Sequence, residues 1–366
     1  MTLRSDAWYS NPAARHWRCP PASTAALAFH QSLPGYRPTN LVPAPALAAE
    51  LRVGRVLVKD ESGRLSLAAF KVLGVSWAVA RLLTGSADGV TFTGLREAAA
   101  GLATELVTAT DGNHGRALAY LGRLLGLPVA VFVPAVAGPA AAAAIGAEGA
   151  QVHVVDGSYD DAVTLAAGYA ADAPGRELVQ DTAWPGYEQV PGWIVAGYDT
   201  LLTEVDEQLG DLRADLVSTP IGVGSLAQAV VTHYRSGQAG TPAILGVEPD
   251  AAPCVLASLR AAEFGSVPTG TTVMAGLNCG TPSTLAWPVL AAGLDADIAV
   301  SDEAAVVAAA DLAAAGIPAG GTGSAALAGV RAALTGPGAE ERREELGVTS
   351  DSVLVLLCTD GRQGLP

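Results

Sequence analysis

Apolar and polar positions follow two alternating periods along most of this chain. Short β-branched apolar runs come first, and each is followed by a loop and by a segment with helical spacing of its apolar residues. Strands that alternate with helices of about 10 to 15 residues are typical of parallel α/β folds. We therefore expect strands at 106–110, 129–134, 151–155, 216–221, 243–249 and 352–358, and helices at 116–126, 139–150 and 226–234.

Three segments lack these periods. The first 50 residues are rich in proline, so we expect an irregular segment that wraps around a domain. Residues 260–290 and 335–347 are expected to form loops with short helices.

Composition narrows the class of protein. The 366 residues are half hydrophobic and only 16% charged, which predicts a folded chain of about two domains. The net charge of −15 argues against nucleic acid and anionic membranes as partners. The sequence shows neither a signal-peptide core nor a run of about 18 apolar residues, so we expect a cytoplasmic protein. The four cysteines lack the spacing of a zinc site, and no metal is predicted.

Arginine supplies nearly all of the positive charge, since only Lys59 and Lys71 of the 21 basic residues are lysines. Lys71 lies within the apolar run LAAFKVLGVSWAVARLL (67–83). Arginine stays protonated, whereas a desolvated lysine can lose its proton and act as a nucleophilic amine. The alternative is that the stem of Lys71 leads its ammonium from a buried helix end to water.

A glycine-rich loop, Gly222-Val223-Gly224-Ser225, follows one expected strand and precedes a helix. Ligands of parallel sheets bind at the carboxyl ends of strands, where glycine N–H groups and a helix N-terminus can hold a phosphate. The run GVGSLA also fits the dinucleotide-binding pattern, with Glu248 at the distance expected for a ribose-binding acid. A tight turn without a ligand is the third interpretation.

Two more loops follow expected strands and carry polar side chains. In the loop TDGNHG, Asn113 can bind a cofactor oxygen, and the loop's N–H groups can bind a substrate carboxylate. After the last strand, either Cys358 or Thr359 can face the nitrogen of a heterocycle. Both loops can also be ordinary turns, the first one capping the next helix.

One ligand, pyridoxal 5'-phosphate (PLP), gives each of these features a role. Its aldehyde would form an imine with Lys71, whose pKa is expected to be lowered by its apolar surroundings. The glycine loop would bind the phosphate, Asn113 the ring oxygen, and Cys358 or Thr359 the ring nitrogen. A nicotinamide-dependent oxidoreductase would explain the glycine loop but leave Lys71 and the TDGNHG loop without a role.

Six stretches resemble a known family. They are KDESGRLSLAAFKVLG, TATDGNHGRALAY, VQDTAWPGYEQVPGWIVAGY, GVGSLA, GVEPD and MAGLNCGTPSTLAW. In this order they are similar to diaminopropionate ammonia-lyases, of the tryptophan-synthase-β-like (fold type II) group of PLP enzymes. The lysine and glycine-loop motifs are shared by the whole group, whereas VQDTAW-x-GY and AGL-x-CG-x-P are more specific to the lyases.

The resemblance implies a fold and a reaction. The expected fold is α/β with two domains, each an open and mostly parallel sheet flanked by helices, and PLP in the cleft between them. Residues 1–85 and 196–366 would form the large domain, and 86–195 a small mobile one. The expected reaction is α,β-elimination of D- or L-2,3-diaminopropionate, or a close β-substituted amino acid, to pyruvate and ammonia by a homodimer.

The resemblance also implies the site residues. Lys71 would be the Schiff-base lysine, and Asp111 and Asp181 would be acid/base residues on the two faces of the substrate Cα. The expected cofactor-binding residues are Phe70, Lys71, Asn113, Gly222, Val223, Gly224, Ser225, Leu226, Cys358 and Thr359. The expected substrate-binding residues are Thr110, Asp111, Gly112 and His114. Cys254 and Cys279 are expected to lie close together at one edge of the site, where they could pair if oxidised.

Three stretches depart from the family pattern. Relatives read R-F-G-L, S-G-E-S-G and S-T-E-G-D where this chain has Arg64–Leu67, 319–323 and 358–362. These departures concern the substrate and its leaving group more than the cofactor. A serine/threonine dehydratase and a β-replacement synthase of the same fold therefore remain alternatives, as does a degenerate PLP-binding protein without activity.

Overall fold

The computed structural model describes residues 7–21, 23–86, 88–237 and 240–362. The chain forms two compact units. The larger unit comprises Met1–Ala22, Pro38–Gly63 and Leu201–Pro366, and the smaller unit comprises Ser23–Arg37 and Arg64–Thr200. The structure thus groups residues 23–37, 64–85 and 196–200 with the smaller unit, whereas the sequence placed them in the large domain. The predicted mobility of the small domain stays a prediction.

The larger unit carries, within its described residues, a seven-stranded sheet of order β1-β10-β9-β8-β11-β3-β2. Its inner strands are parallel, and β1 and β2 pair antiparallel at the two edges. The strands are β1 Trp8–Ser10, β2 Leu41–Pro43, β3 Arg55–Asp60, β8 Leu216–Pro220, β9 Ala243–Pro249, β10 Ala296–Val300 and β11 Val353–Cys358. The helices are α2 Pro45–Leu51, α9 Ser225–Arg235, α10 Cys254–Ala261, α11 Ala286–Gly293, α12 Asp302–Ala314, α13 Gly321–Leu334 and α14 Ala339–Leu346.

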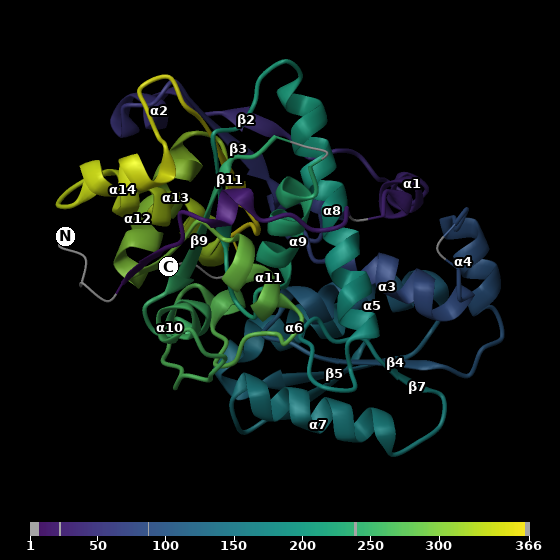
Figure 1. The fold of residues 1–366 in the computed structure, drawn as a ribbon. Helices are drawn as coiled ribbons and strands as arrows, with labels where there is room; N and C mark the ends of the chain where they lie inside the picture. Colours follow the sequence, from purple (N-terminus) through teal and green to yellow (C-terminus); the bar gives the residue numbers. More distant parts are fainter. Residues whose placement is uncertain (1–6, 22, 87, 238–239, 363–366) are drawn as a thin grey trace. The chain divides into compact units, whose positions relative to one another are not determined.

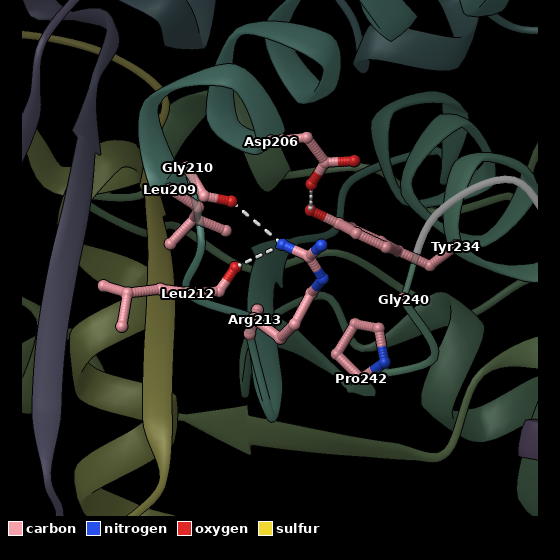
Figure 2. Close-up of a pocket in the computed structure, with 9 residues that line it drawn as sticks. Asp206, Leu209, Gly210, Leu212, Arg213, Tyr234, Gly240 and Pro242 are labelled. Atoms are coloured by element: carbon pink, nitrogen blue, oxygen red, sulfur yellow. Dashed lines mark hydrogen bonds between the residues drawn. The ribbon is translucent and has the colours of Figure 1, made fainter.

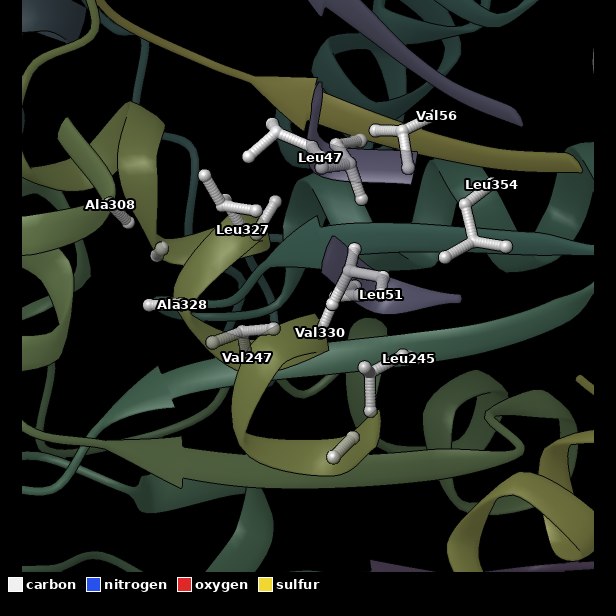
Figure 3. Packing of buried hydrophobic residues seen from close by; sticks show 14 of the residues in the cluster. Leu47, Leu51, Val56, Leu245, Val247, Ala308, Leu327, Ala328, Val330 and Leu354 are labelled. Carbon is white, nitrogen blue, oxygen red and sulfur yellow. The ribbon is translucent and has the colours of Figure 1, made fainter. Parts of the chain in front are cut away.

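The core of the larger unit lies between this sheet and α13, whose residues are almost all buried. Figure 3 shows leucine and valine side chains of the strands meeting Leu327 and Val330 of this helix. A Cβ on Gly329 would lie 2.3 Å from Val247 Cγ2, so glycine lets the helix approach β9 closely. The strands and α13 are apolar on nearly every side. This explains why α13 covers one face of the sheet.

The N-terminal segment is less irregular than the sequence predicted. It supplies both edge strands of the larger sheet, and β1 pairs with β10 through Trp8 and Ile298. Arg15 adds an ion pair with Asp295 at 2.9 Å. The pattern did not reveal these strands because each is only three residues long.

The smaller unit carries a parallel sheet of order β6-β5-β4-β7, with α7 on one face and α3 and α5 toward the other (Figure 1). The strands are β4 Glu105–Ala109, β5 Val129–Pro134, β6 Gln151–Val155 and β7 Arg176–Leu178. The helices are α1 Ala25–Gln31, α3 Val72–Thr84, α4 Phe92–Ala99, α5 Asn113–Leu125, α6 Gly138–Ala147 and α7 Tyr159–Ala171, and α8 Gln189–Leu209 contains the boundary between the units.

The predicted strands and helices are confirmed to within a few residues at their ends. The largest differences are three residues: α6 ends at Ala147 rather than at 150, and α5 begins at Asn113 rather than at Arg116. Polar loop residues therefore form the first turn of this helix. Within the described part of the chain, no helix has both the length and the apolar composition needed to cross a bilayer.

Candidate active site

Lys71 lies directly before α3 and already has helical backbone angles. Its side chain is 20% exposed, and its Nζ donates a hydrogen bond of 2.6 Å to Asp181 Oδ2. The rings of Phe70 and Tyr198 pack on each other and lie 5.4 and 6.0 Å from the same nitrogen. The sequence predicted apolar surroundings alone, and the structure adds a carboxylate partner.

Asp181 follows β7 and is nearly buried. Burial would raise the pKa of Asp181, but the nearby Lys71 and His114 outweigh it and hold this pKa below its usual range. His114 Nε2 lies 2.7 Å from the Val179 carbonyl oxygen, to which it can donate, and its Nδ1 lies 3.6 Å from Asp181 Oδ2. Burial lowers the pKa of His114, which favours the neutral ring.

Asp111 lies in the loop between β4 and α5 and is partly buried. Burial raises its pKa to about 7, the negative charge of Asp181 adds to this, and Lys71 opposes it. The two carboxyl groups thus differ at neutral pH, since Asp181 is ionised while Asp111 is present in both protonation states. Such a difference suits two groups with separate acid and base roles.

The loop that carries Asp111 is shaped by its glycines and by Thr110. The hydroxyl of Thr110 accepts a hydrogen bond of 2.9 Å from the Gly112 N–H. A Cβ on Gly115 would lie 2.3 Å from Thr110 Cγ2, so glycine lets the first turn of α5 approach this loop. Asn113 is consequently the first residue of that helix.

The loop from Gly222 to Ser225 leads from β8 into α9, as the sequence predicted. Gly224 has φ of +99°, a conformation that favours glycine. Val223 and Gly224 are buried, and within the described residues their N–H groups have no acceptor. Unsatisfied amides at a helix N-terminus fit a phosphate group.

Cys358 ends β11, and Thr359 follows it. The Cys358 thiol lies 3.6 Å from the Asp360 carbonyl oxygen and packs in the core of the larger unit. Thr359 is 2% exposed, and its hydroxyl is without a partner among the described residues. The hydroxyl of Thr359 therefore fits a heterocycle nitrogen better than the thiol does.

The structure gathers the predicted residues into two groups. In the smaller unit, Lys71, Asp111, His114 and Asp181 lie together although they span 110 positions of the chain. In the larger unit, the glycine loop and Thr359 follow β8 and β11, which are adjacent strands.

The second lysine, Lys59, lies in the larger unit and is fully buried. Its Nζ donates to Glu204 Oε2 at 2.6 Å, to the Thr39 carbonyl oxygen at 2.9 Å and to Gln208 Oε1 at 3.0 Å. Three acceptors around one nitrogen match the three protons of an ammonium group. This explains why the position holds lysine rather than the planar guanidinium of arginine.

Glu248 does not have the environment of a ribose-binding acid. It is fully buried at the end of β9, and its two carboxyl oxygens accept the N–H groups of Val255 and Leu256 at 2.9 and 2.5 Å. Burial and the neighbouring Asp297 raise its pKa well above the usual range. The dinucleotide interpretation of GVGSLA therefore loses its acidic partner.

Cys254 and Cys279 flank the first glycine of the loop. The Cys254 thiol lies 3.6 Å from the Gly222 carbonyl oxygen, and a Cβ on Gly222 would lie 3.3 Å from Cys279 Sγ. Neither of them forms a disulfide bond within the described part of the chain. Their pairing on oxidation stays a prediction.

Two residues around Asp181 escaped the sequence analysis. Tyr159 begins α7 and donates to Asp181 Oδ1 at 3.3 Å, and Gln180 Nε2 donates to the same oxygen at 3.3 Å. Gln180 stands next to Asp181 in the motif VQDTAW, which was a signal for its proximity. Tyr159 lies 22 positions away and had no such signal.

The segment before Lys71 that departs from the family pattern has an unusual backbone. Leu65, Ser66 and Ala68 have φ angles of 48°, 62° and 59°. Residues other than glycine rarely adopt this left-handed backbone conformation, because their Cβ atom crowds the following carbonyl oxygen. The family pattern has glycine at position 66. Ser66 carries a side chain there, so its backbone is strained.

A pocket of about 470 Å³ lies elsewhere in the larger unit (Figure 2). It is lined by Arg213 and Ala214 before β8 and by Pro242 before β9. Arg213 is held there by the Gly210 and Leu212 carbonyl oxygens at 2.9 and 2.8 Å. The pocket thus lies at the opposite ends of these strands from the glycine loop. Among the described residues no group of three or more His, Cys, Asp and Glu could hold a metal ion.

A lysine beside two acids and a glycine loop that leads into a helix N-terminus fit a PLP enzyme, and residues 32–358 match the pyridoxal-phosphate dependent enzyme family. The chain belongs to this family.

Its curated relatives include diaminopropionate ammonia-lyases. The one from Salmonella typhimurium is 39% identical over 279 residues, which cover 72% of this chain and 69% of that protein. The one from Escherichia coli K12 is 35% identical over 350 residues, which cover 91% of this chain and 86% of that protein.

Solved structures of the Escherichia coli enzyme share the fold. Its complex with an aminoacrylate–PLP azomethine reaction intermediate has a TM-score of 0.86 at 32% identity, covering 97% of this chain and 93% of that chain. Its complex with D-serine has a TM-score of 0.88 at 33% identity, with the same coverage. The fold type II architecture predicted from the sequence is thereby confirmed.

Proposed function

We propose that this chain is a PLP-dependent ammonia-lyase that removes the Cα proton and the β-amino group of 2,3-diaminopropionate. The first product would be ammonia and 2-aminoacrylate, which water converts to pyruvate and a second ammonia. The proposal draws on the relatives named diaminopropionate ammonia-lyase, which are 35–39% identical to this chain over the aligned residues.

The observation that carries the proposal is the contact between Lys71 and Asp181 at 2.6 Å, with Asp111 close enough to feel the charge of both. An elimination needs a group that takes a proton from Cα. A lysine with two acids of different protonation state supplies such groups close together in space.

The proposed cofactor contacts are those that the resemblance to the lyases implies. Lys71 would bond to the PLP aldehyde, and Phe70 and Asn113 would lie beside the ring. The N–H groups of the loop from Gly222 to Ser225, with Leu226 behind them, would hold the phosphate, and the Thr359 hydroxyl would face the ring nitrogen. When bound, PLP delocalises the electron pair that remains on Cα after proton removal.

A hydroxyl beside the ring nitrogen favours a neutral pyridine, because a hydroxyl is too weak an acid to protonate it. A neutral ring withdraws electrons less strongly than a protonated one, which suits elimination over transamination. Cys358 fits this position less well, since burial raises the pKa of its thiol and its Sγ contacts the Asp360 carbonyl oxygen.

The two aspartates would act on opposite faces of the substrate Cα, so that both D- and L-isomers react. Asp181 is ionised over the neutral range and can accept a proton. Asp111, with a pKa of about 7, can accept or donate one. His114 would orient Asp181 and the substrate as a neutral ring, and the N–H groups near Thr110 and Gly112 would bind the substrate carboxylate.

The direct test is the release of pyruvate and ammonia from D- and L-2,3-diaminopropionate by purified holoenzyme. Serine, threonine and β-chloroalanine serve as competitors for the assignment of the leaving group. Faster release of a 2-oxo acid from serine or threonine would make the chain a dehydratase. No 2-oxo acid from any of these substrates would contradict the elimination reaction itself.

The proposal includes a homodimer in the cytoplasm, for which the resemblance to the lyases is the support. Light scattering during size-exclusion chromatography measures the mass directly. A single species near 37 kDa, the mass of one chain, would contradict the dimer.

A further inference from the structure

Asp181 has partners on both of its carboxyl oxygens, and they are of different kinds. Oδ2 accepts the hydrogen bond of Lys71 Nζ at 2.6 Å. Oδ1 faces the Tyr159 hydroxyl and the Gln180 amide nitrogen, each at 3.3 Å. The side of the carboxylate that faces away from the lysine is therefore occupied by two neutral donors.

Gln180 is fixed at every polar atom of its side chain. Its Oε1 accepts the Thr108 hydroxyl and the Ala109 N–H, both at 2.9 Å, and its Nε2 donates to Tyr159 Oη at 2.8 Å. It is also fully buried. Because Thr108 and Ala109 end the strand before Asp111, Gln180 connects the two loops that carry the aspartates.

The main chain of the same residue is held as well. The Tyr187 hydroxyl accepts the Gln180 N–H at 2.9 Å and donates to the Leu178 carbonyl oxygen at 2.8 Å. The burial of Gln180 and the saturation of its hydrogen bonds leave its amide one orientation, with the NH₂ group directed at Oδ1 of Asp181.

We propose that Tyr159 and Gln180 are positioning residues that hold Oδ1 of Asp181, so that Oδ2 is the oxygen presented to Lys71 and to the substrate Cα. This inference rests on the proposed function of Asp181. A hydroxyl and an amide that donate to a carboxylate stabilise its charged form, so they also keep Asp181 ready to accept a proton. The groups that act on the Asp181 charge are Lys71, Asp111, His114, Tyr159, Tyr187 and Tyr198.

The chain offers a matched control within the same helix. Tyr169 also lies in α7, and its hydroxyl donates to a carboxylate, Glu105 Oε2, at 3.2 Å. Tyr159→Phe and Tyr169→Phe therefore each remove one phenol–carboxylate hydrogen bond from α7. Only the first of them touches Asp181.

The experiment uses NMR to measure how fast the holoenzyme exchanges the Cα hydrogen of D- or L-alanine in D₂O. Alanine has no β-leaving group, so the exchange reports proton removal apart from elimination. The isomer that Asp181→Asn stops exchanging is the Asp181-dependent one. For it, Tyr159→Phe should move the acid limb of the pH profile upward by about one pH unit, because loss of a donor raises the pKa of Asp181.

Tyr169→Phe should leave this acid limb where it is, and the other isomer should keep its profile in both variants. An unchanged limb in Tyr159→Phe, or equal shifts in the two tyrosine variants, would overturn the inference. If Tyr159→Phe fails to fold, Gln180→Met should produce a shift in the same direction. Wild-type enzyme that exchanges neither alanine isomer and releases no pyruvate would instead contradict the proposed function.

Discussion

The two lysines of this chain each lie 2.6 Å from a carboxylate, yet their surroundings differ. Lys59 is fully buried against Glu204, and its remaining protons are taken by Thr39 and Gln208. The side chain of Lys71 is 20% exposed and lies against aromatic rings. A closed set of acceptors makes a structural ammonium, whereas a reactive amine needs access and a partner that a ligand can replace.

The largest effect is expected from Lys71. Lys71→Ala should lower turnover by roughly 10⁴-fold or more while the fold is kept, because the nucleophilic amine is lost. Lys71→Arg should not restore activity, since a guanidinium stays protonated. Turnover assays measure the loss of activity, and circular dichroism measures whether the fold is kept. A Lys71→Ala variant with near wild-type turnover would contradict the assignment of Lys71 as the reactive lysine.

The two aspartates near Lys71 should each act on one isomer of the substrate. Asp181→Asn should slow one isomer of 2,3-diaminopropionate by about 10²- to 10⁴-fold, and Asp111→Asn the other isomer, because each removes a proton-transfer group. Kinetics on the separate isomers measure both effects. If each variant loses both isomers equally, the assignment of the aspartates to opposite faces fails.

Lys59 should matter for stability instead of chemistry. Lys59→Met should cost about 3–5 kcal/mol of unfolding free energy, because it removes the ammonium that compensates the buried Glu204 charge. Chemical denaturation measures this cost, and the double variant Lys59→Met/Glu204→Leu should recover much of it. A Lys59→Met variant with wild-type stability would contradict a structural role for the ion pair between Lys59 and Glu204.

The pH dependence should separate the two aspartates by a smaller effect. A base works in its ionised form, so the isomer that needs Asp111 should react about tenfold faster per pH unit as the pH rises toward about 7. The isomer that needs Asp181 should show no rise in this range, because the pKa of Asp181 lies below its usual range. Profiles of kcat/KM with the same rise for both isomers would contradict this separation.

Much of the fold was predictable from the sequence. Buried parallel strands are continuous apolar runs, and helices with a clear apolar periodicity separate these runs. The loops after those strands were predictable for the same reason, and with them the positions of Asp111 and the glycine loop. Lys71 was recognisable because it is one of only two lysines and lies in an apolar run. The three-residue edge strands were not, since so short a segment shows no period.

The hydrogen-bond partners were less predictable than the reactive residues. Glu204 lies 145 positions from Lys59, and Tyr159 lies 22 positions from Asp181, so no local pattern connects them. The carboxylate beside Lys71 likewise comes from 110 positions away. Choosing between Cys358 and Thr359 required the structure, because only there does one of them lack a partner among the described residues.

The central claim is that Lys71, and not Lys59, bonds to PLP. Borohydride reduction of the holoenzyme should fix the cofactor to one peptide, and with only two lysines in the chain peptide mass mapping gives a single answer. The account predicts an absorbance band at the violet edge of the visible range and a reduced label on Lys71 alone. A label on Lys59, or a PLP-loaded protein without this band, would contradict it.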